Sequence, residues 1–289
     1  MHAGFSSVIA SHEMRRFGLS IAPTLVIFEL ILSLLHYFSL VDTMARLSLR
    51  AEARRFYLSY FWWVLEPLLY VAVFWFVFEY LLGTRTPDFL MFLAVGKLAF
   101  IWFSKTVNYA ANSVAENAGL IGRMDIPKTL FPLAVILECS YRQVAVFALL
   151  MAVILLDGRP PTMNWLWLLP LAALQLLLII ACGFFASILV VVSRDFAPLI
   201  NLGMVFLMFV SGVFWDLNEL PNTDAVNLLM TINPLAFLLN SYRQVLLWQQ
   251  TPDFLLMSVL AAATIVAIAF LTWLMNRFSK QIARRVMSQ

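Results

Sequence analysis

The stretch that decides the fold is "LRAEARRFYLSYFWWVLEPLL", residues 49–69. Arg50, Arg54 and Arg55 run directly into an aromatic segment, and Glu66 follows just inside the apolar run. Arginines favour the headgroup layer of a membrane, and tryptophans concentrate at the boundary between water and lipid. The stretch therefore predicts a surface helix that turns into a membrane and carries a carboxylate inside.

The composition supports a membrane protein. Of 289 residues, 63% are hydrophobic and 12% are charged, and the mean hydropathy is +0.89. A soluble domain averages about 45–50% apolar and 25% charged residues. Apolar runs of the length that crosses a bilayer, about 20 residues, recur along most of the chain. A second, soluble domain with its own core is therefore excluded.

The apolar runs predict an all-α polytopic membrane protein with about six transmembrane helices. These spans are expected near residues 60–82, 89–111, 129–156, 165–192, 197–214 and 254–276. Turn-rich connectors separate them, and a longer polar connector occupies residues 115–128. Residues 216–253 are too polar and broken for a crossing, and they predict short re-entrant helices before the last span. Asn233 is the expected N-cap of one such helix, with Pro234 at its first position.

The distribution of basic residues predicts the orientation. If residues 43–56 are cytoplasmic, most Lys and Arg side chains fall inside. The inside set is Arg15, Arg16, Arg46, Arg50, Arg54, Arg55, Arg123, Lys128, Arg194, Arg277, Lys280, Arg284 and Arg285. Only Arg85, Arg159 and Arg243 fall outside. Short cytoplasmic loops favour Lys and Arg, so both termini are expected in the cytoplasm. The net charge of +3 is then a topology signal and does not indicate nucleic-acid binding.

Residues 43–56 are expected to form an amphipathic interface helix. Arg46, Arg50 and Arg54 recur every fourth residue on one helical face, and Asp42 could cap the N-terminus. Such a helix would lie along the membrane with its guanidinium groups among the headgroups. The alternative, that these arginines only anchor the first transmembrane helix, stays open.

Residues 1–42 are expected to form an N-terminal extension before a transmembrane domain at 43–289. The apolar stretch at 20–41 contains Pro23 near its start and polar side chains on one helical face. A crossing by this stretch would place the preceding arginine pair outside, against the charge rule. We therefore expect a surface-lying or re-entrant helix, with a crossing as the alternative.

Motifs of an independent enzyme are absent from the sequence. It has no glycine-rich phosphate loop of the G-x-x-x-x-G-K-[ST] type and no nucleophile elbow. His2, His12 and His36 have no metal-ligand spacing, and Cys139 and Cys182 are expected to be small buried hydrophobic residues. Nothing in the sequence therefore resembles a self-sufficient enzyme, and if energy is consumed, a partner is expected to hydrolyse the nucleotide.

Several ionisable residues lie within the expected spans. These are Glu66, Glu79, Lys97, Lys105, Glu138 and Arg142. A charge at membrane depth costs about 2.5–3.5 kcal/mol on insertion scales, so such residues are functional candidates. The i, i+4 spacing of Glu138 and Arg142 favours an ion pair on one helix. Lys97 and Lys105, two turns apart, could face one polar cavity.

Aromatic residues are also in excess, with 25 Phe, 9 Trp and 8 Tyr. Several recur at helical spacing on the first two expected spans, where they could stack on sugar rings. Interface belts and helix packing are the alternative explanation for about half of them.

At "RRFYLSYFWWVLEPLL" the sequence resembles the permease subunits of ATP-binding-cassette exporters of cell-surface polysaccharides. The tryptophan pair and the Glu-Pro step match the family pattern, while Leu58-Ser59 departs from the usual Leu-Gly. "AENAGLIGRMDIPKTLFPLAVILE", "VVVSRDFAPLINLGMVFLMFVSGVFW" and "INPLAFLLNSYRQVLL" resemble later family segments in the same order. The resemblance covers about residues 43–278.

The resemblance implies a homodimer of permeases in the bacterial inner membrane, with two copies of a cytoplasmic ATP-binding subunit. This chain would bind no cofactor, and the partner would bind ATP and Mg²⁺. The residues implied for ATPase coupling are Glu116, Asn117, Arg123 and Asp125. Those implied for the substrate entrance are Arg50, Arg54, Arg55, Trp62, Trp63 and Glu66. Those implied for the translocation path are Tyr70, Phe74, Lys97, Phe103, Lys105, Tyr109, Phe206 and Phe209.

The implied substrate is a lipid-linked polysaccharide. Capsular polysaccharide is preferred, and O-antigen or teichoic acid is the alternative; periplasmic and outer-membrane export proteins are further expected partners. One rival function is a small-molecule exporter of the same architecture. Another is a membrane-embedded lipid-carrier transferase, which would need a catalytic loop acid; Asp88, Asp157 and Asp195 are available but isolated.

Overall fold

The computed structural model describes most of the chain. The described residues are 23–55, 62, 65–66, 68–70, 72–73, 76–81, 89–124, 126–216 and 229–287. Contacts divide the chain into two compact units, Met1–Thr43 and Met44–Gln289. The described part of the first unit is helical and belongs to helix α2.

Helix α2 extends from Pro23 to Arg55 without a break. The sequence predicted Asp42 as the N-cap of a helix over residues 43–56. That prediction is wrong, because Asp42 lies inside a continuous helix and caps no helix start. Leu, Ala, Met, Arg and Glu fill the residues after position 42, and their high helix propensity explains why the helix continues.

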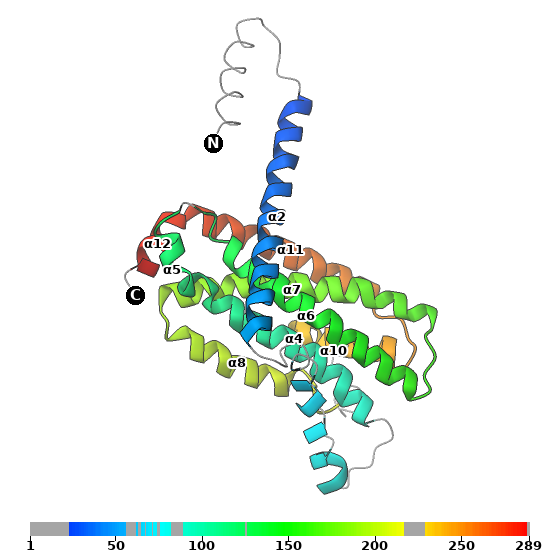
Figure 1. The fold of residues 1–289 in the computed structure, drawn as a ribbon. Coiled ribbons are helices and arrows are strands. Elements are labelled where there is room, and N and C mark those ends of the chain that lie inside the picture. The colour runs from blue at the N-terminus through cyan, green and yellow to red at the C-terminus, as the bar shows by residue number, and fades with distance from the viewer. Residues whose placement is uncertain are drawn as a thin grey trace, which may run out of the picture. The chain divides into compact units, whose positions relative to one another are not determined.

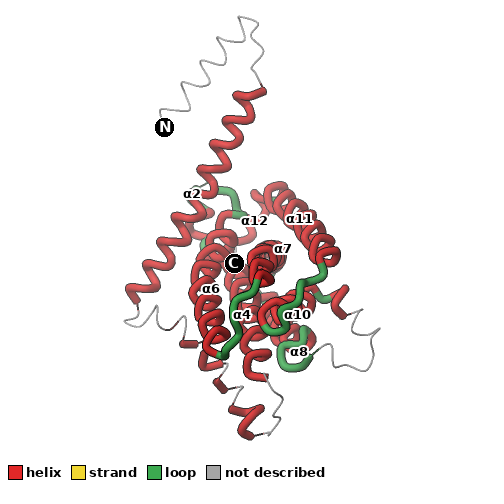
Figure 2. Tube along the Cα trace, turned by 90° about the vertical axis from the view of Figure 1, so that its right-hand side faces the viewer, coloured by secondary structure: helices red, strands yellow, loops and turns green. Residues whose placement is uncertain are grey.

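The second unit is a bundle of helices (Figure 1). After α2 its elements are η1 (Phe76–Leu81), α4 (Phe89–Glu116), α5 (Ala118–Ile121), α6 (Leu130–Leu156), η2 (Met163–Trp167), α7 (Leu168–Val192), α8 (Phe196–Val210), α10 (Pro234–Leu246), α11 (Phe254–Arg277) and α12 (Ser279–Met287). Figure 2 views the bundle along its length, with α7 between α4 and α11. Helix α4 also packs extensively against α6, and α10 packs against both α4 and α7.

Among the described residues, four helices are long and apolar enough to cross a membrane: Phe89–Glu116, Leu130–Leu156, Met163–Val192 and Phe254–Arg277. The expected all-α polytopic membrane fold is confirmed. The span expected at 197–214 is shorter than predicted, because α8 has 15 residues and covers only about 22 Å at 1.5 Å per residue. Most of the span expected at 60–82 lies outside the described residues.

Small residues and buried amides bring α4, α6 and α7 together. A Cβ at Gly183 on α7 would lie 3.1 Å from Ala110 Cβ on α4 and 3.2 Å from Ile136 Cδ1 on α6. Gln175 Nε2 on α7 donates to the carbonyl oxygen of Ala99 on α4 at 2.8 Å. Such close approach and interhelical hydrogen bonding hold helices together where lipid removes the hydrophobic driving force.

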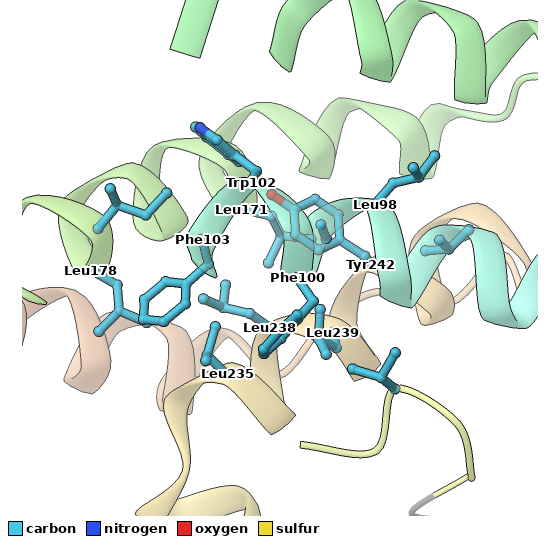
Figure 3. Close-up of a cluster of buried hydrophobic side chains, with 14 of the residues drawn as sticks. Leu98, Phe100, Trp102, Phe103, Leu171, Leu178, Leu235, Leu238, Leu239 and Tyr242 are labelled. Atoms are coloured by element: carbon cyan, nitrogen blue, oxygen red, sulfur yellow. The ribbon is translucent and has the colours of Figure 1, made fainter. Parts of the chain in front are cut away.

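The main core joins α4, α7 and α10. Figure 3 shows Phe100 and Phe103 from α4 facing leucines of the other two helices. Leu178 of α7 and Leu235 and Leu238 of α10 belong to the same cluster. The short helix α10 is therefore an integral part of the bundle.

Helix α10 begins where the sequence predicted. The Asn233 side chain accepts from the backbone N–H groups of Leu235, at 3.1 Å, and Ala236, at 3.3 Å, and Pro234 occupies the first turn. Asn233 Nδ2 also donates to Ser211 Oγ at 3.0 Å, which links the cap to the turn after α8. The predicted N-cap is confirmed.

Arg243 connects α10 to that same turn and to α4. Its guanidinium donates to three carbonyl oxygens: Phe92 at 3.2 Å, Gly212 at 2.7 Å and Val213 at 3.0 Å. The side chain is only 1% exposed and lies over the Phe92 ring, 3.4 Å from its centroid. Gly96 leaves room for it, because a Cβ there would overlap the guanidinium. A residue that the sequence treated as a topology marker is therefore a buried structural link.

Replacing Arg243 with Met should destabilise the protein by about 3 kcal/mol or more, since three buried carbonyl groups lose their charged donor. Arg243→Lys should also destabilise it, because one ammonium cannot reproduce the planar fork. Thermal denaturation of the detergent-purified protein measures the effect.

Gly96→Ala is an independent variant, and its added methyl group should displace the guanidinium and lower the melting temperature. Arg277→Gln, at an exposed arginine, is the matched control and should leave the melting temperature unchanged. An Arg243→Met protein as stable as the wild type would contradict this structural role.

Candidate functional site

A charged pocket lies among Glu52 near the end of α2, Trp62, Glu66, α4 and α6, all within the second unit. Its volume is about 280 Å³. The lining residues are Glu52, Trp62, Glu66, Ile101, Trp102, Lys105, Thr106, Tyr109, Cys139, Arg142, Gln143 and Val146. Ionisable groups within helices of membrane-crossing length are rare and mark functional sites by default. We call this cavity the polar pocket.

Arg142 is the centre of an ion network on one side of the polar pocket. Its guanidinium pairs with Glu138, one turn earlier on α6, and with Glu52 on α2. A second bond joins Arg142 Nη1 and Glu52 Oε1 at 3.3 Å. The Glu138–Arg142 pair predicted from the i, i+4 spacing is confirmed, and the structure adds Glu52 as a second partner of Arg142. Arg142 thereby connects α6 to the C-terminal half of α2.

Glu66 and Lys105 form the other ion pair of the pocket, with Nζ and Oε1 2.5 Å apart. Each side chain is about one-third exposed, so solvent reaches the pair. Lys105 lies 11 residues before Glu116, or about 16 Å from that end of α4. Glu66 is therefore level with the middle of α4. Three carboxylates, Glu52, Glu66 and Glu138, thus pair with the two cations Lys105 and Arg142.

Aromatic and amide groups complete the polar pocket. Trp62 and Tyr109 are partly exposed beside it, and Trp102 packs edge-on against Phe147 at 5.8 Å between ring centroids. Trp102 Nε1 and Gln143 Nε2 are buried donors without an acceptor among the described residues. The pocket thus combines charges, N–H donors and flat aromatic faces, which are the groups that bind phosphates and sugar rings.

Lys97 lies elsewhere. It is 6% exposed, and its Nζ is 2.9 Å from Met208 Sδ on α8 and 5.6 Å from the centroid of the Tyr70 ring. The expectation that Lys97 and Lys105 share one cavity is wrong. Two turns of α4 separate them, but α8 covers Lys97, while Lys105 faces Glu66.

The other residues predicted for the substrate entrance are only partly described. Arg50 is exposed on α2. Arg54 and Arg55 end that helix, but their side chains lie outside the described part, as does Trp63. The structure therefore brings two members of the predicted set, Trp62 and Glu66, into the polar pocket.

Two of the predicted coupling residues, Glu116 and Asn117, directly precede the short helix α5, which packs against α12 (Figure 1). Glu116 is exposed at the end of α4, and Asn117 Nδ2 donates to the Ser113 carbonyl at 2.7 Å. Arg123 lines a cavity of about 250 Å³ together with Lys280 of α12. Asp125 lies outside the described residues.

The residues predicted for the translocation path do not share one surface of this chain. Phe103 is 2% exposed inside the main core, whereas Tyr109 borders the polar pocket. Phe206 and Phe209 are exposed on α8. Phe74 lies outside the described residues. The role of the set stays a prediction.

Sequence reasoning missed Glu52 as a site residue. Glu52 lies among the arginines of α2, and a single acidic residue in such a segment indicates no more than a solvated surface of mixed charge. Its partner is 90 residues away, and no local spacing connects them. The only local signal is that Glu52 lies two residues from Arg50 and Arg54, and therefore points to another side of the helix.

Comparison with known proteins identifies the family. Residues 39–247 match the ABC-2 type transporter family. The chain is 24% identical over 240 residues to the O-antigen export system permease protein RfbA of Myxococcus xanthus, covering 83% of this chain and 92% of that one. It is 22% identical over 250 residues to the protein of the same name from Klebsiella pneumoniae, with coverage of 85% and 95%. It is 26% identical over 236 residues to the polysialic acid transport protein KpsM of Escherichia coli, with coverage of 79% and 89%. This multi-pass membrane protein belongs to the ABC-2 type transporter family.

Proposed function

We propose that this chain is the permease subunit of an exporter that moves a lipid-linked cell-surface polysaccharide across the inner membrane. Two copies of the chain form the path, and two copies of a separate cytoplasmic subunit bind ATP and Mg²⁺ and supply the energy. This chain contributes no catalytic residue and binds no cofactor. Its termini lie in the cytoplasm.

The family match over residues 39–247 carries this proposal. The named relatives export O-antigen or transport polysialic acid, and the matches cover about nine-tenths of each relative. An alignment of that extent includes the helices that frame the polar pocket. Export or transport of a polysaccharide is the activity that these names share.

The polar pocket supports the proposal chemically. A lipid-linked polysaccharide presents a phosphate and a chain of hydroxyl-rich rings. Lys105 and Arg142 offer positive charge to the phosphate, although each is already held by carboxylates. A substrate phosphate would compete with Glu66 and Glu52 for these cations, so binding would release these two carboxylates from α4 and α6. The pocket then serves as a charge-sensitive gate.

The end of the bundle near α12 supports an ATPase docking site. The short helix α5 and the residues up to Lys128 are exposed in part, and Arg123 and Lys280 border a shared cavity. Placing this end in the cytoplasm agrees with the distribution of basic residues. The partner subunit would then contact Glu116, Asn117, Arg123 and Asp125.

Capsular polysaccharide is our first candidate substrate, and O-antigen is the second, since the named relatives include both kinds of transporter. Deleting the gene should leave polymer in the cytoplasm and remove it from the cell surface. Separate extraction of capsule and of lipopolysaccharide from the mutant distinguishes the two. Normal surface display of both polymers would contradict the proposal.

Double substitution of Glu116 and Arg123 by Ala should uncouple the permease from its ATPase. The ATPase activity of the reconstituted complex should then lose its stimulation by the permease, while the melting temperature of the permease stays the same. ATP hydrolysis and transport in proteoliposomes measure this effect. Lys280→Ala, on the neighbouring helix, tests whether α12 shares the contact; wild-type stimulation in the double variant would rule out this coupling site.

Replacing Arg50, Arg54 and Arg55 together with Gln should reduce export and leave assembly intact, because these side chains would meet substrate phosphate at the membrane surface. Export is measured by surface polymer, and assembly by co-purification of the ATPase. Arg277→Gln provides the control for loss of one exposed positive charge. Full export by the triple variant would exclude this entrance.

Variants of the Glu66–Lys105 pair distinguish a structural role of Lys105 from a role in binding substrate. Because the pair is about one-third exposed, Lys105→Gln should change stability by only about 0–1 kcal/mol. The charge-swapped double variant, Glu66→Lys with Lys105→Glu, restores the pair. If the cation at 105 binds substrate, export stays low in both variants while both proteins fold. Normal export by the swapped protein would show that only the pairing matters.

A further inference from the structure

A second cavity, of about 760 Å³, lies between the ends of α7 and α11 and the helix α12. Its wall is mainly apolar and includes Ile188, Val191, Leu274 and Phe278. This cavity is separate from the polar pocket, because the two share no lining residue. Neither the ATPase contact nor the substrate path proposed above uses it. We call it the α12 cavity.

Two arginines give the α12 cavity a positive rim. Arg284 and Arg285 both contribute to the lining, and no carboxylate of the described residues does. Arg285 is held in place, with Nε 3.3 Å and Nη2 3.1 Å from the carbonyl oxygen of Val192 at the end of α7. Both arginines are exposed. The rim therefore presents two exposed guanidinium groups to an anion, and a backbone carbonyl fixes one of them.

The position of the cavity matches the boundary between headgroups and acyl chains. Helix α11 has 24 residues and is about 36 Å long, enough to cross a hydrocarbon core of about 30 Å. Leu274 and Phe278 lie at its C-terminal end. Helix α12 follows directly, packs Ile282 and Val286 against the protein core and exposes its basic side chains at this end of α11.

We propose that the α12 cavity binds one anionic phospholipid. The headgroup phosphate lies between Arg284 and Arg285, and an acyl chain runs along Ile188 and Leu274. Charge complementarity favours this ligand over a neutral lipid, because a positive rim without acids gains from each negative charge that it meets. The volume falls within the range of small-molecule sites, about 300–1,000 Å³. The proposal is independent of the exported substrate.

The test is native mass spectrometry of the full-length protein, purified from nanodiscs that contain either phosphatidylglycerol or phosphatidylcholine. The wild type should retain phosphatidylglycerol in clear preference to phosphatidylcholine. Arg284→Gln with Arg285→Gln should lower that retention about tenfold or more, since each arginine near an anionic surface contributes about 1 kcal/mol. Arg277→Gln removes an exposed charge that does not line the cavity and should lower retention less than the double variant does.

A second variant fills the cavity and keeps the charges. Val192 is exposed and lines the cavity, so Val192→Trp should occupy the acyl site without disturbing the core and should also reduce retention. Val259→Trp, at an exposed position on α11 outside the cavity, is the matched control. Equal retention of the two lipids would overturn the proposal, as would undiminished retention in the double arginine variant. A cross-link between a cysteine at position 192 and another protein would also overturn it, because that result would place a protein at the cavity instead of a lipid.

Discussion

The structure depends on one buried cation that is neutralised mainly by backbone dipoles. Arg243 replaces its lost hydration with the carbonyl oxygens of Phe92, Gly212 and Val213. Because these oxygens come from α4 and from the turn after α8, one side chain fixes the place of three chain segments. Gly96 and the left-handed Gly212, with φ of +69°, supply the space and the turn that this arrangement needs. A short helix that could not cross a membrane is thereby fixed deep within the bundle.

The polar pocket follows a different rule, since its charges neutralise one another. Arg142 holds two carboxylates from two helices, and Lys105 holds a third carboxylate from residues 62–66. Such pairs lower the cost of charge at membrane depth and still leave it exchangeable with an incoming anion. The contrast with Arg243 is physical. The backbone carbonyl groups that bind Arg243 are fixed in place, so an incoming anion cannot displace them. The carboxylate side chains that bind Arg142 can move away and be replaced by such an anion.

Sequence reasoning reached the features that have a local cause. The Asn233 cap and the Glu138–Arg142 pair are set by spacing within one helix, and both are confirmed. The four long spans follow from apolar length alone. The contact between Glu52 and Arg142 joins positions 90 residues apart. The Arg243 guanidinium donates to backbone carbonyl groups, which every residue type carries. Neither interaction can be predicted from residue spacing or residue type in a single sequence. The continuous α2 was missed because a capping residue such as Asp42 is common inside helices too.

The packing of α12 has a consequence for biosynthesis. Ile121 of α5 reaches its full burial in a cluster with Ile282 and Val286, and Gly122 lies close to Met287. The ribosome makes residues 118–128 long before it makes α12. This connector therefore stays without part of its core until α12 has emerged. Partial chains that lack α12 cannot present a finished connector, so a docking partner that requires it would recruit only copies that contain α12.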